Sequence, residues 1–218
     1  MPRKASQEPE KETAATQDKS VQLVVATGNV GKLREIRAAL EGLRIAVIDR
    51  RQAGLGEPPD EEGESYLANA LGKACWAAQA SGQPALGEDS GIEIEALGGE
   101  PGVHSSRFLG LEAGDADRNA EILSRLAGVD PSHRGARYRC VVALRWPEGE
   151  ELVTMGESDG RIALEERGTG GFGYDPIFEL PDSAVTMAQL TVQEKGRVSH
   201  RGQALRRLAE ALTRRGGL

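Results

Sequence analysis

The segment V-V-A-T-G-N-V-G-K-L-R-E-I, Val24 to Ile36, joins two kinds of hydrophobic pattern within a few residues. It overlaps a β-branched run, Val21 to Ala26, of the kind that forms buried strands. Apolar residues then recur at helical spacing as Leu33, Ile36 and Leu40. The segment therefore predicts a strand, a turn and an amphipathic helix as the opening unit of the chain.

The turn of this unit is similar to a phosphate-binding P-loop but departs from it at two fixed positions. A P-loop needs Gly-x4-Gly-Lys-Ser/Thr, and here Ala26 replaces the first glycine and Leu33 replaces the hydroxyl residue. A turn that enters a helix still presents N–H donors and the positive end of the helix dipole to an anion. Thr27, Asn29 and Lys32 could add side-chain donors. The alternative is that Thr27 or Asn29 only caps the helix while Lys32 is solvated.

The rest of the chain alternates between strand-like and helix-like segments. Ala85 to Leu97 predicts paired strands interrupted near Gly91. The helix predicted over Tyr66 to Ala80 carries an apolar stripe that includes Leu67 and Leu71. Further strands are predicted over Ile45–Ile48, Ala136–Trp146 and Leu152–Leu164, and further helices over Asp115–Leu126 and Ser199–Arg215. This alternation, with one long hairpin, indicates an α/β protein with a mixed sheet.

Length and composition restrict the class of protein. The chain has 218 residues, enough for one domain over residues 21–218, whereas residues 1–20 lack large aliphatic side chains and are predicted to be a disordered tail. The net charge of −7 argues against binding to a nucleic acid polymer and leaves room for a small anion held by local cations. Cys75 and Cys140 have no metal or CxxC spacing, which favours reduced thiols in the cytoplasm. No apolar run approaches the roughly 18 residues of a membrane span.

Two adjacent acids stand inside the predicted strand region G-E-D-S-G-I-E-I-E, Gly87 to Glu95. Because successive strand residues face opposite sides, Glu88 and Asp89 enter one site only if a turn at Ser90 bends the chain. We favour Asp89, the acid nearer that turn, as a carboxylate that holds Mg²⁺ or deprotonates a water molecule. The alternative is an Asx-turn in which Asp89 satisfies backbone donors.

The loop G-T-G-G-F-G-Y-D-P, Gly168 to Pro176, contains four glycines. Glycines in that number are costly unless the backbone takes positive φ or approaches a ligand closely. An aromatic side chain held by such a loop, Phe172 or Tyr174, is a natural stacking platform for a planar base. The alternative is a tight turn that buries Phe172 in the core.

Three cations occupy positions that a surface role explains poorly. Ser199 is the predicted N-cap of the last helix, so His200 and Arg201 lie in its first turn, where cations oppose the helix dipole. Their donors suit a ligand carbonyl or phosphate oxygen. Lys73 lies about 120° from the apolar stripe of its helix and could face a cleft, although a surface lysine explains it equally well.

Taken together, these segments resemble the Ham1/RdgB family of noncanonical purine nucleoside triphosphate pyrophosphatases, also called inosine triphosphate pyrophosphatases or XTP/dITP diphosphatases. The resemblance runs from Val24 to about Leu212. It is carried by T-G-N-V-G-K, by E-D-S-G-I followed by A-L-G-G-E-P-G-V-H-S-S-R-F, by G-T-G-G-F-G-Y-D-P-I-F and by S-H-R-G-Q-A-L, in that order. Any one of these motifs is weak, but four in order are specific.

The resemblance implies a two-lobed fold built on a long mixed sheet flanked by helices, with the active site in a cleft between the lobes, a homodimer and dependence on Mg²⁺. It implies that Asp89 is the general base and a metal ligand, with Glu61 as a further ligand. Members often carry Asp-Asp where this chain has Glu88-Asp89, which leaves the contact of Glu88 with the metal open. The implied substrate-binding residues are Thr27, Gly28, Asn29, Val30, Gly31, Lys32, Lys73, Ser90, Phe172, Gly173, Tyr174, Asp175, Lys195, His200 and Arg201.

The resulting hypothesis is an enzyme that cleaves ITP, dITP or XTP at the α-β phosphoanhydride into a monophosphate and pyrophosphate. Donors from His200 and Arg201 would accept a purine 6-oxygen and reject the 6-amino group of adenine, because the mismatch leaves buried polar groups unpaired. Two alternatives stay open. One is a Maf-like pyrophosphatase for other modified nucleotides, and the other is a nucleotide-binding sensor that does not hydrolyse its ligand.

Overall fold

The structure, a computed structural model, describes residues 21–59 and 63–218. The predicted tail over residues 1–20 lies outside the described residues, as does Glu61. The strands are β1 Val21–Val25, β2 Ile45–Asp49, β3 Ala85–Ile94, β4 Gly135–Arg145, β5 Glu151–Ile162 and β6 Phe178–Glu179. The helices are α1 Val30–Ala39, α2 Tyr66–Ser81, α3 Asp115–Arg125, α4 Val192–Val198 and α5 His200–Arg215.

One six-stranded sheet runs through the molecule in the order β2-β1-β3-β4-β5-β6. The strand β1 pairs in parallel with β2 and β3, whereas β3, β4, β5 and β6 pair with one another in antiparallel fashion. The mixed α/β sheet expected from the sequence is thus confirmed. The hairpin of β4 and β5 is also confirmed.

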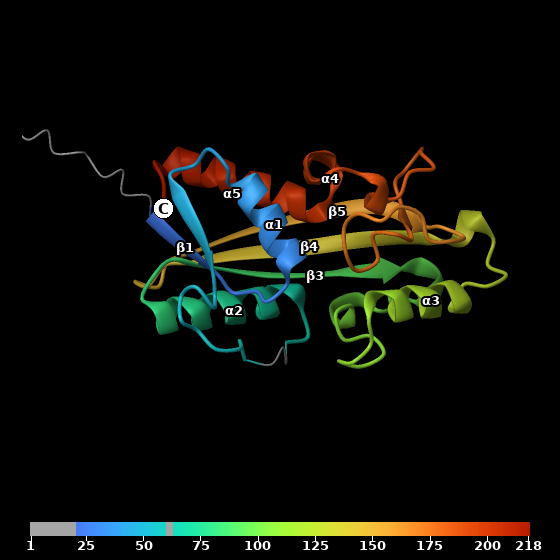
Figure 1. Ribbon diagram of the computed structural model, residues 1–218, viewed down its shortest axis with the longest axis horizontal. Helices are drawn as coiled ribbons and strands as arrows, with labels where there is room; N and C mark the ends of the chain where they lie inside the picture. The colour runs from blue at the N-terminus through green and yellow to red at the C-terminus, as the bar shows by residue number, and fades with distance from the viewer. Residues whose placement is uncertain (1–20, 60–62) are drawn as a thin grey trace, which may run out of the picture.

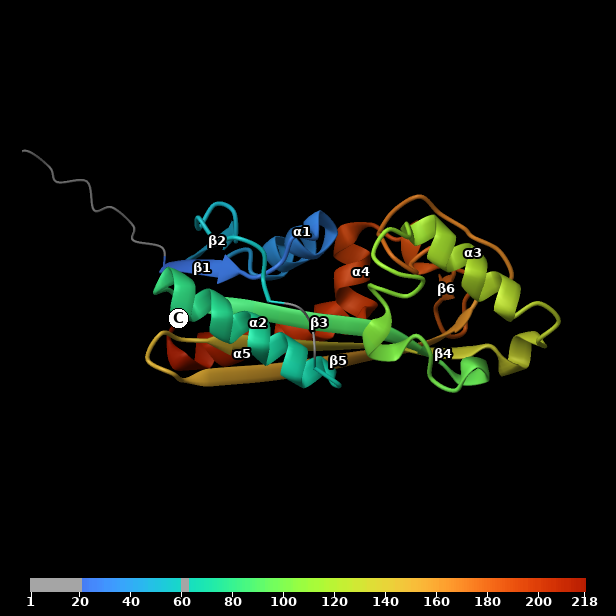
Figure 2. The same cartoon turned by 90° about the horizontal axis from the view of Figure 1, so that it is seen from below.

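Helices cover both faces of the sheet. Figure 1 shows α1, α4 and α5 on one face and α2 and α3 on the other. Seen from below, α3 and β6 lie at the end of the molecule opposite to β1 and β2 (Figure 2). Two of the hydrophobic clusters follow this division. One packs β1, α1 and α5 around residues such as Leu86 and Leu208, and the other packs α3 and β6 around Ile122 and Phe178. The two-lobed α/β fold is therefore confirmed.

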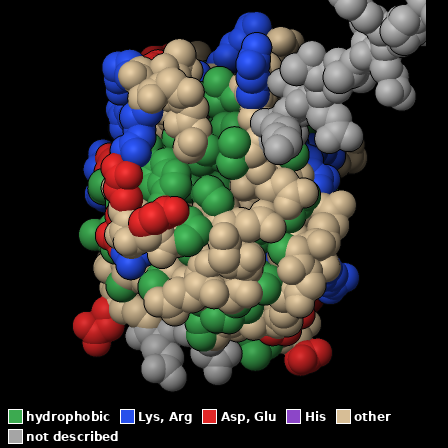
Figure 3. Space-filling model, turned by 90° about the vertical axis from the view of Figure 1, so that its left-hand side faces the viewer, with side chains coloured by type: hydrophobic (Ala, Val, Ile, Leu, Met, Phe, Trp, Pro, Cys, Tyr) green, Lys and Arg blue, Asp and Glu red, His purple; other side chains and the backbone are tan. Residues whose placement is uncertain are grey.

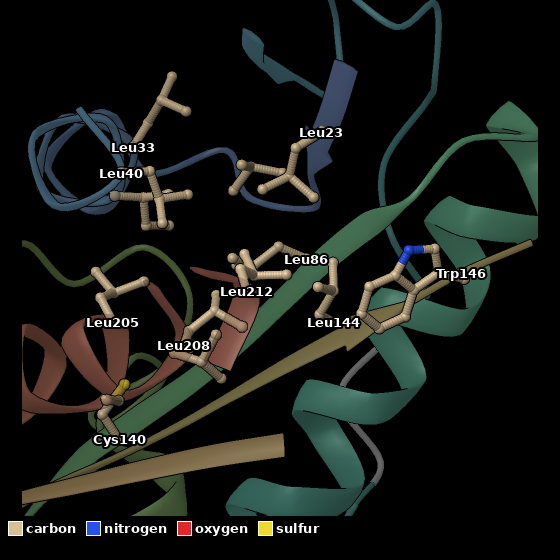
Figure 4. Packing of buried hydrophobic residues seen from close by; sticks show 14 residues of the cluster. Leu23, Leu33, Leu40, Leu86, Cys140, Leu144, Trp146, Leu205, Leu208 and Leu212 are labelled. Carbon is tan, nitrogen blue, oxygen red and sulfur yellow. The ribbon is translucent and has the colours of Figure 1, made fainter. Parts of the chain in front are cut away.

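The first of these clusters lies between the sheet and the helices α1 and α5. Figure 4 shows Leu33 and Leu40 of α1 on one side of the cluster and Leu205 and Leu208 of α5 on the other, with Leu86 of β3 beside them. At the end of the molecule that bears the C-terminus, hydrophobic side chains reach the surface among Lys, Arg, Asp and Glu side chains (Figure 3). The cluster holds α1 and α5 against one face of the sheet, which sets the position of both helix N-termini.

Two details of the predicted elements are wrong. The strand β3 is continuous from Ala85 to Ile94, with no turn at Ser90. Gly91 instead permits a close approach, because an added Cβ would lie 2.2 Å from the carbonyl oxygen of Gly102. On α2, Leu67 is exposed, and the buried face is formed by Asn69, Ala70, Lys73, Ala74, Ala77 and Ala78.

Small residues form the buried face of α2 for a steric reason. An added Cβ at Gly87 would lie 2.1 Å from the carbonyl oxygen of Ala70, so α2 packs directly on the backbone of β3. A helix that approaches a strand this closely favours small side chains at the contact, and leucine is too large for it.

The helix α4 was not predicted. Its short pattern V-Q-E-K-G-R-V contains few apolar residues, and Thr191 caps it by accepting a hydrogen bond from the N–H of Glu194.

Candidate active site

The turn between β1 and α1 is shaped by its own side chains. Asn29 caps α1 by accepting a hydrogen bond from the N–H of Lys32 at 3.0 Å. Thr27 accepts one from the N–H of Asn29 at 3.1 Å. Gly28, Asn29 and Val30 are exposed. The turn therefore presents the positive end of the α1 dipole to solvent, as an anion site requires.

The aromatic ring of Phe172 rests on this turn. An added Cβ at Gly31 would lie 2.4 Å from Cδ1 of Phe172, so only glycine permits the contact. The ammonium of Lys195 and the guanidinium of Arg201 lie 4.6 and 5.2 Å from the centre of the same ring. Phe172 is half-buried and lines a pocket rather than the hydrophobic core. Its position is consistent with a stacking platform.

One pocket gathers most of the predicted substrate residues. It spans about 670 Å³ when the open solvent at its mouth is included. Ser105, Ser106, Asp115, Arg118 and Tyr138, which the sequence did not single out, also contribute to its walls. The predicted residues that line it are Asn29, Lys32, Ser90, Phe172, Gly173, Tyr174, Asp175, Lys195, His200 and Arg201.

The loop that carries Phe172 is tied to α3. The N–H of Gly173 donates to Asp115 at 2.7 Å, and the carbonyl of Gly173 accepts from Asn119 at 3.2 Å. The N–H of Phe172 donates to Asp175 at 2.9 Å. The hydroxyl of Tyr174 donates to the carbonyl of Ser105 at 2.8 Å and is buried. These bonds fix the Phe172 backbone from both sides.

Buried ion pairs connect α1, β3 and α5 behind the pocket. Lys32 lies 2.7 Å from Glu88. Arg201 donates to Glu88 at 3.0 Å, to Glu35 at 2.7 Å and to Ser90 at 2.8 Å. All three guanidinium nitrogens of Arg201 thus have protein partners. The observed contacts of Arg201 orient Glu88 and Ser90, while its direct contact with a base stays a prediction.

The same network continues to α4. Lys195 lies 2.8 Å from Glu35 and also donates to Asp175. Burial alone would raise the pKa of Glu35, but Arg201 and Lys195 outweigh it and hold that pKa below its usual value. Burial raises the pKa of Asp175 although Lys195 opposes it. Glu35 was missed by the sequence reasoning. A signal was available, because an acid directly before Ile36 stands beside the apolar stripe of its helix.

Glu88 is held ionised by its cations. Burial alone would raise its pKa, but Arg201, Lys32 and Lys73 together hold the pKa of Glu88 well below its usual range. The thiol of Cys140 also donates to Glu88 at 3.3 Å. Because Glu88 is already paired within the protein on the pocket side of β3, its main observed role is to bind Lys32 and Arg201.

His200 forms part of the pocket floor. Its ring is stacked on that of Tyr138, with centroids 4.3 Å apart and an angle of 5° between the planes. Within residues 21–59 and 63–218, its Nδ1 meets no hydrogen-bond partner. Burial, reinforced by Arg201 and Lys195, holds the pKa of His200 well below its usual range. The imidazole is therefore neutral near pH 7, and its buried Nδ1 has no hydrogen-bond partner among the described residues.

Asp89 and Lys73 lie on the opposite face of β3. Asp89 accepts a hydrogen bond from Asn69 at 2.9 Å, and the ammonium of Lys73 lies 3.6 Å from its other oxygen. Asp89 is buried between β3 and α2, and Lys73 extends from α2 toward it; neither side chain lines the pocket that contains Ser90. Thr27, Gly28, Val30 and Gly31 lie in the adjoining turn, also outside the pocket walls.

One edge of β3 lies between the pocket residue Ser90 and the buried pair of Asp89 and Lys73. The strand β1 pairs with β3 only at Val24 with Ala85 and at Val25 with Leu86. Beyond these pairs, Gly87 to Ser90 have no strand neighbour on that side among the described residues. Lys32 and Ser90 lie on one face of this unpaired edge, and Asp89 lies on the other face with Lys73 of α2 beside it.

Asp89 contributes a carboxylate, whereas Asn69 donates to it through its amide nitrogen. Carboxylate oxygens are hard ligands of the kind that Mg²⁺ selects. Among the described residues, no group of three or more His, Cys, Asp or Glu side chains is placed to hold a metal. The second predicted ligand, Glu61, lies outside the described residues.

Comparisons with known proteins converge on one family. The Ham1 family model matches residues 23–211. The chain is 44% identical to a dITP/XTP pyrophosphatase of Thermus thermophilus over 88% of this chain and 92% of the relative. It is 47% identical to a dITP/XTP pyrophosphatase of Deinococcus deserti over 88% and 90%. The structure of a HAM1 protein from Coxiella burnetii aligns with a TM-score of 0.80 and 42% identity, over 89% of this chain and 99% of that chain.

Proposed function

This chain belongs to the Ham1 family, and we propose that it hydrolyses noncanonical purine nucleoside triphosphates such as dITP and XTP. The products are a nucleoside monophosphate and pyrophosphate. The relatives with 44% and 47% identity bear the name dITP/XTP pyrophosphatase. The four motifs on which the resemblance rests are distributed over both lobes, and all four contribute residues that line one pocket.

A single observation carries this proposal. One pocket is lined both by Asn29, the cap of α1, with Lys32, and by Phe172 with His200. The first pair suits phosphate, because it combines a helix N-terminus with a lysine. The second pair suits a flat, polar base, because it combines an aromatic ring with a neutral imidazole. A nucleotide is the ligand that requires both pairs together.

We assign the chemical step to the open edge of β3. Asp89 orients and deprotonates the attacking water, and Lys73 beside it offsets negative charge on the phosphates. Asp89, with Glu61, would hold Mg²⁺, which supplies Lewis-acid activation of the phosphoryl group when bound. Lys32 and Ser90 bind the polyphosphate from the pocket side. This arrangement surrounds the α-phosphorus with groups from both faces of one strand.

Base selection is assigned to His200. We assign one ring N–H of this neutral imidazole as the donor to a purine 6-oxygen. The 6-amino group of adenine would bring a second donor to the same point, and the unpaired buried groups would disfavour ATP. Burial, reinforced by Arg201 and Lys195, lowers the pKa of His200 and keeps it neutral, and the same two cations lie over the ring of Phe172.

Pyrophosphate release tests the activity. The protein is incubated with dITP, XTP, ATP or GTP in the presence of Mg²⁺, and pyrophosphate and orthophosphate are assayed separately. Pyrophosphate from dITP and XTP, with much slower turnover of ATP and GTP, is the expected result. A Maf-like enzyme would prefer other modified nucleotides, and a sensor would bind dITP without product. Orthophosphate as the product, or equal rates on all four, would contradict the proposal.

Assembly and location belong to the same proposal. Residues 21–218 are proposed to act as one catalytic domain within a homodimer, which light scattering would report as twice the chain mass of 23.2 kDa. Cys75 and Cys140 are free cysteines, and we propose a cytoplasmic location, where thiols stay reduced. In the described part of the chain, no helix combines the length and apolar character needed to cross a bilayer. The net charge of −7 supports a small-molecule substrate rather than a nucleic acid polymer.

A further inference from the structure

A buried arginine that belongs to none of the four motifs lies against the phosphate-binding turn. Arg50 directly follows β2, and its residue is only 4% exposed. Its Nη2 lies 3.3 Å and its Nε 3.7 Å from the point that a Cβ of Gly28 would occupy. The edge of the guanidinium that carries Nε and Nη2 therefore faces the turn. This is one of the edges with which arginine binds phosphate through two parallel hydrogen bonds.

One donor on that edge of Arg50 has no hydrogen-bond partner among the described residues. Its Nη1 donates to the carbonyl of Gly56 at 2.7 Å, and its Nη2 donates to Glu57. Its Nε meets no acceptor among the residues that the structure describes. A buried donor without a partner is destabilising, so an incoming acceptor at this point would remove a cost already present in the folded protein.

Glu57 is a weak competitor for this edge. Its side chain is 76% exposed, whereas that of Arg50 is 5% exposed. An ion pair with one well-solvated partner contributes little to stability and is readily exchanged. A phosphate group carries more negative charge and more acceptor oxygens than a carboxylate. The contact with Glu57 therefore does not prevent Arg50 from binding a phosphate.

The sheet order places Arg50 at one end of the site. The strands β2, β1 and β3 are parallel and adjacent, so the segments that follow β1 and β2 emerge at the same edge. Ligands of open α/β sheets bind at this carboxyl edge. Across it, Ser90 and the base pocket lie at β3, the Thr27–Lys32 turn follows β1, and Arg50 follows β2. Two strand spacings, about 10 Å, separate β3 from β2.

We propose that Arg50 binds the terminal phosphate of the substrate and selects triphosphates over diphosphates. This inference rests on the proposed function, since it requires a nucleotide whose base lies in the Phe172 pocket. A polyphosphate that starts beside β3 and crosses the turn brings its last phosphate to the Nε and Nη2 edge of Arg50. A diphosphate is one phosphate shorter and does not reach this edge.

The test compares Arg50→Lys with the adjacent, exposed Arg51→Ala as control. Lysine keeps the charge but lacks the planar pair of donors. For Arg50→Lys we expect the KM for dITP to rise about 10- to 30-fold, with kcat and the inhibition constant of dIDP changed less than about threefold. For Arg51→Ala we expect all three quantities to change less than about twofold.

A second variant separates phosphate binding from anchoring of the 50–57 loop. Glu57→Gln removes the competing carboxylate, so it should lower the KM for dITP and leave the inhibition constant of dIDP unchanged. If Arg50 only anchors the loop, Glu57→Gln should instead lower the melting temperature without improving the KM. Equal effects of Arg50→Lys on dITP and dIDP, or no effect on dITP, would overturn the inference.

The binding of an inorganic polyphosphate, which carries no base, can be measured without catalysis. Inorganic tripolyphosphate and pyrophosphate are titrated into the wild-type protein and into Arg50→Lys by calorimetry. We expect the variant to lose affinity for tripolyphosphate selectively. If the wild-type protein binds tripolyphosphate through Arg50 but does not hydrolyse dITP, the proposed function fails and only the phosphate contact of Arg50 survives. If it hydrolyses dITP and the two probes respond alike to Arg50→Lys, the inference fails alone.

Discussion

Gly31→Ala adds one methyl group where α1 meets the ring of Phe172. The new Cβ would lie 2.4 Å from Cδ1, 2.8 Å from Cε1 and 3.0 Å from Cγ of that ring. Ordinary van der Waals contact begins at 3.4 Å, so the ring must retreat by about 1 Å. The backbone of α1 does not resist the substitution itself, because alanine is a better helix former than glycine by about 0.5–1 kcal/mol. The strain therefore falls on Phe172.

The displacement should weaken base stacking more than it weakens the fold. Base–aromatic stacking contributes about 1–3 kcal/mol per base, and a misplacement of about 1 Å can cost about 100-fold in rate. We expect kcat/KM for dITP to fall about 10- to 100-fold, equivalent to about 1.4–2.7 kcal/mol of transition-state stabilisation. The melting temperature should change by only a few degrees, because Phe172 is half-buried and helix propensity partly offsets the contact.

The assay is steady-state pyrophosphate release together with thermal unfolding. Gly72→Ala is the matched control, since Gly72 is also helical and a Cβ there would meet nothing within 4 Å. A double-mutant cycle with Phe172→Ala identifies the cause. Once the ring is absent, Gly31→Ala should have no further effect on kcat/KM. An undiminished effect in the Phe172→Ala background, or unchanged kcat/KM in the single variant, would refute the reasoning.

Three further predictions concern the catalytic acid, the ion network and the histidine. Asp89→Asn should lower kcat by at least about 100-fold, while calorimetric affinity for tripolyphosphate changes less than about threefold; near-normal kcat would remove Asp89 as the base. Glu35→Gln should lower the free energy of unfolding in urea by about 3 kcal/mol, because Lys195 and Arg201 lose a buried counter-charge, whereas the exposed Glu41→Gln should not. Because the pKa of His200 is held low by burial and then by Arg201 and Lys195, only the unfolded chain binds its proton near pH 6.5. Stability should therefore fall as the pH drops below about 6.5, and His200→Gln should flatten this dependence; an unchanged slope would contradict the assignment.

Much of the pocket could be predicted because its motifs carry local signals. The cap formed by Asn29 follows from a polar residue placed before an amphipathic helix, and Ser199 caps α5 in the same way. Phe172 was identified because its loop is rich in glycine. His200 was identified because a cation in a first helical turn is unfavourable there. Each of these inferences depends on residues within one turn of the chain.

The errors arose where a local rule met a long-range contact. Gly91 predicts an interruption of the strand, but its lack of a side chain instead permits the carbonyl of Gly102 to approach β3. Leu67 belongs to an apolar stripe, but Gly87 brings α2 so close to the sheet that alanines occupy the interface. Glu35 was overlooked because its partners, Lys195 and Arg201, lie more than 150 residues away in the sequence.

The sequence by itself determined the strand, turn and helix at the start of the chain, the mixed α/β class and the four motifs of the family. These follow from hydrophobic period, capping and glycine chemistry, which act between neighbours. Only the tertiary structure decided that Asp89 faces α2 while Ser90 faces the pocket, and that Arg50 lies against Gly28. Sheet order and packing bring these groups together, and both depend on contacts that no local segment contains.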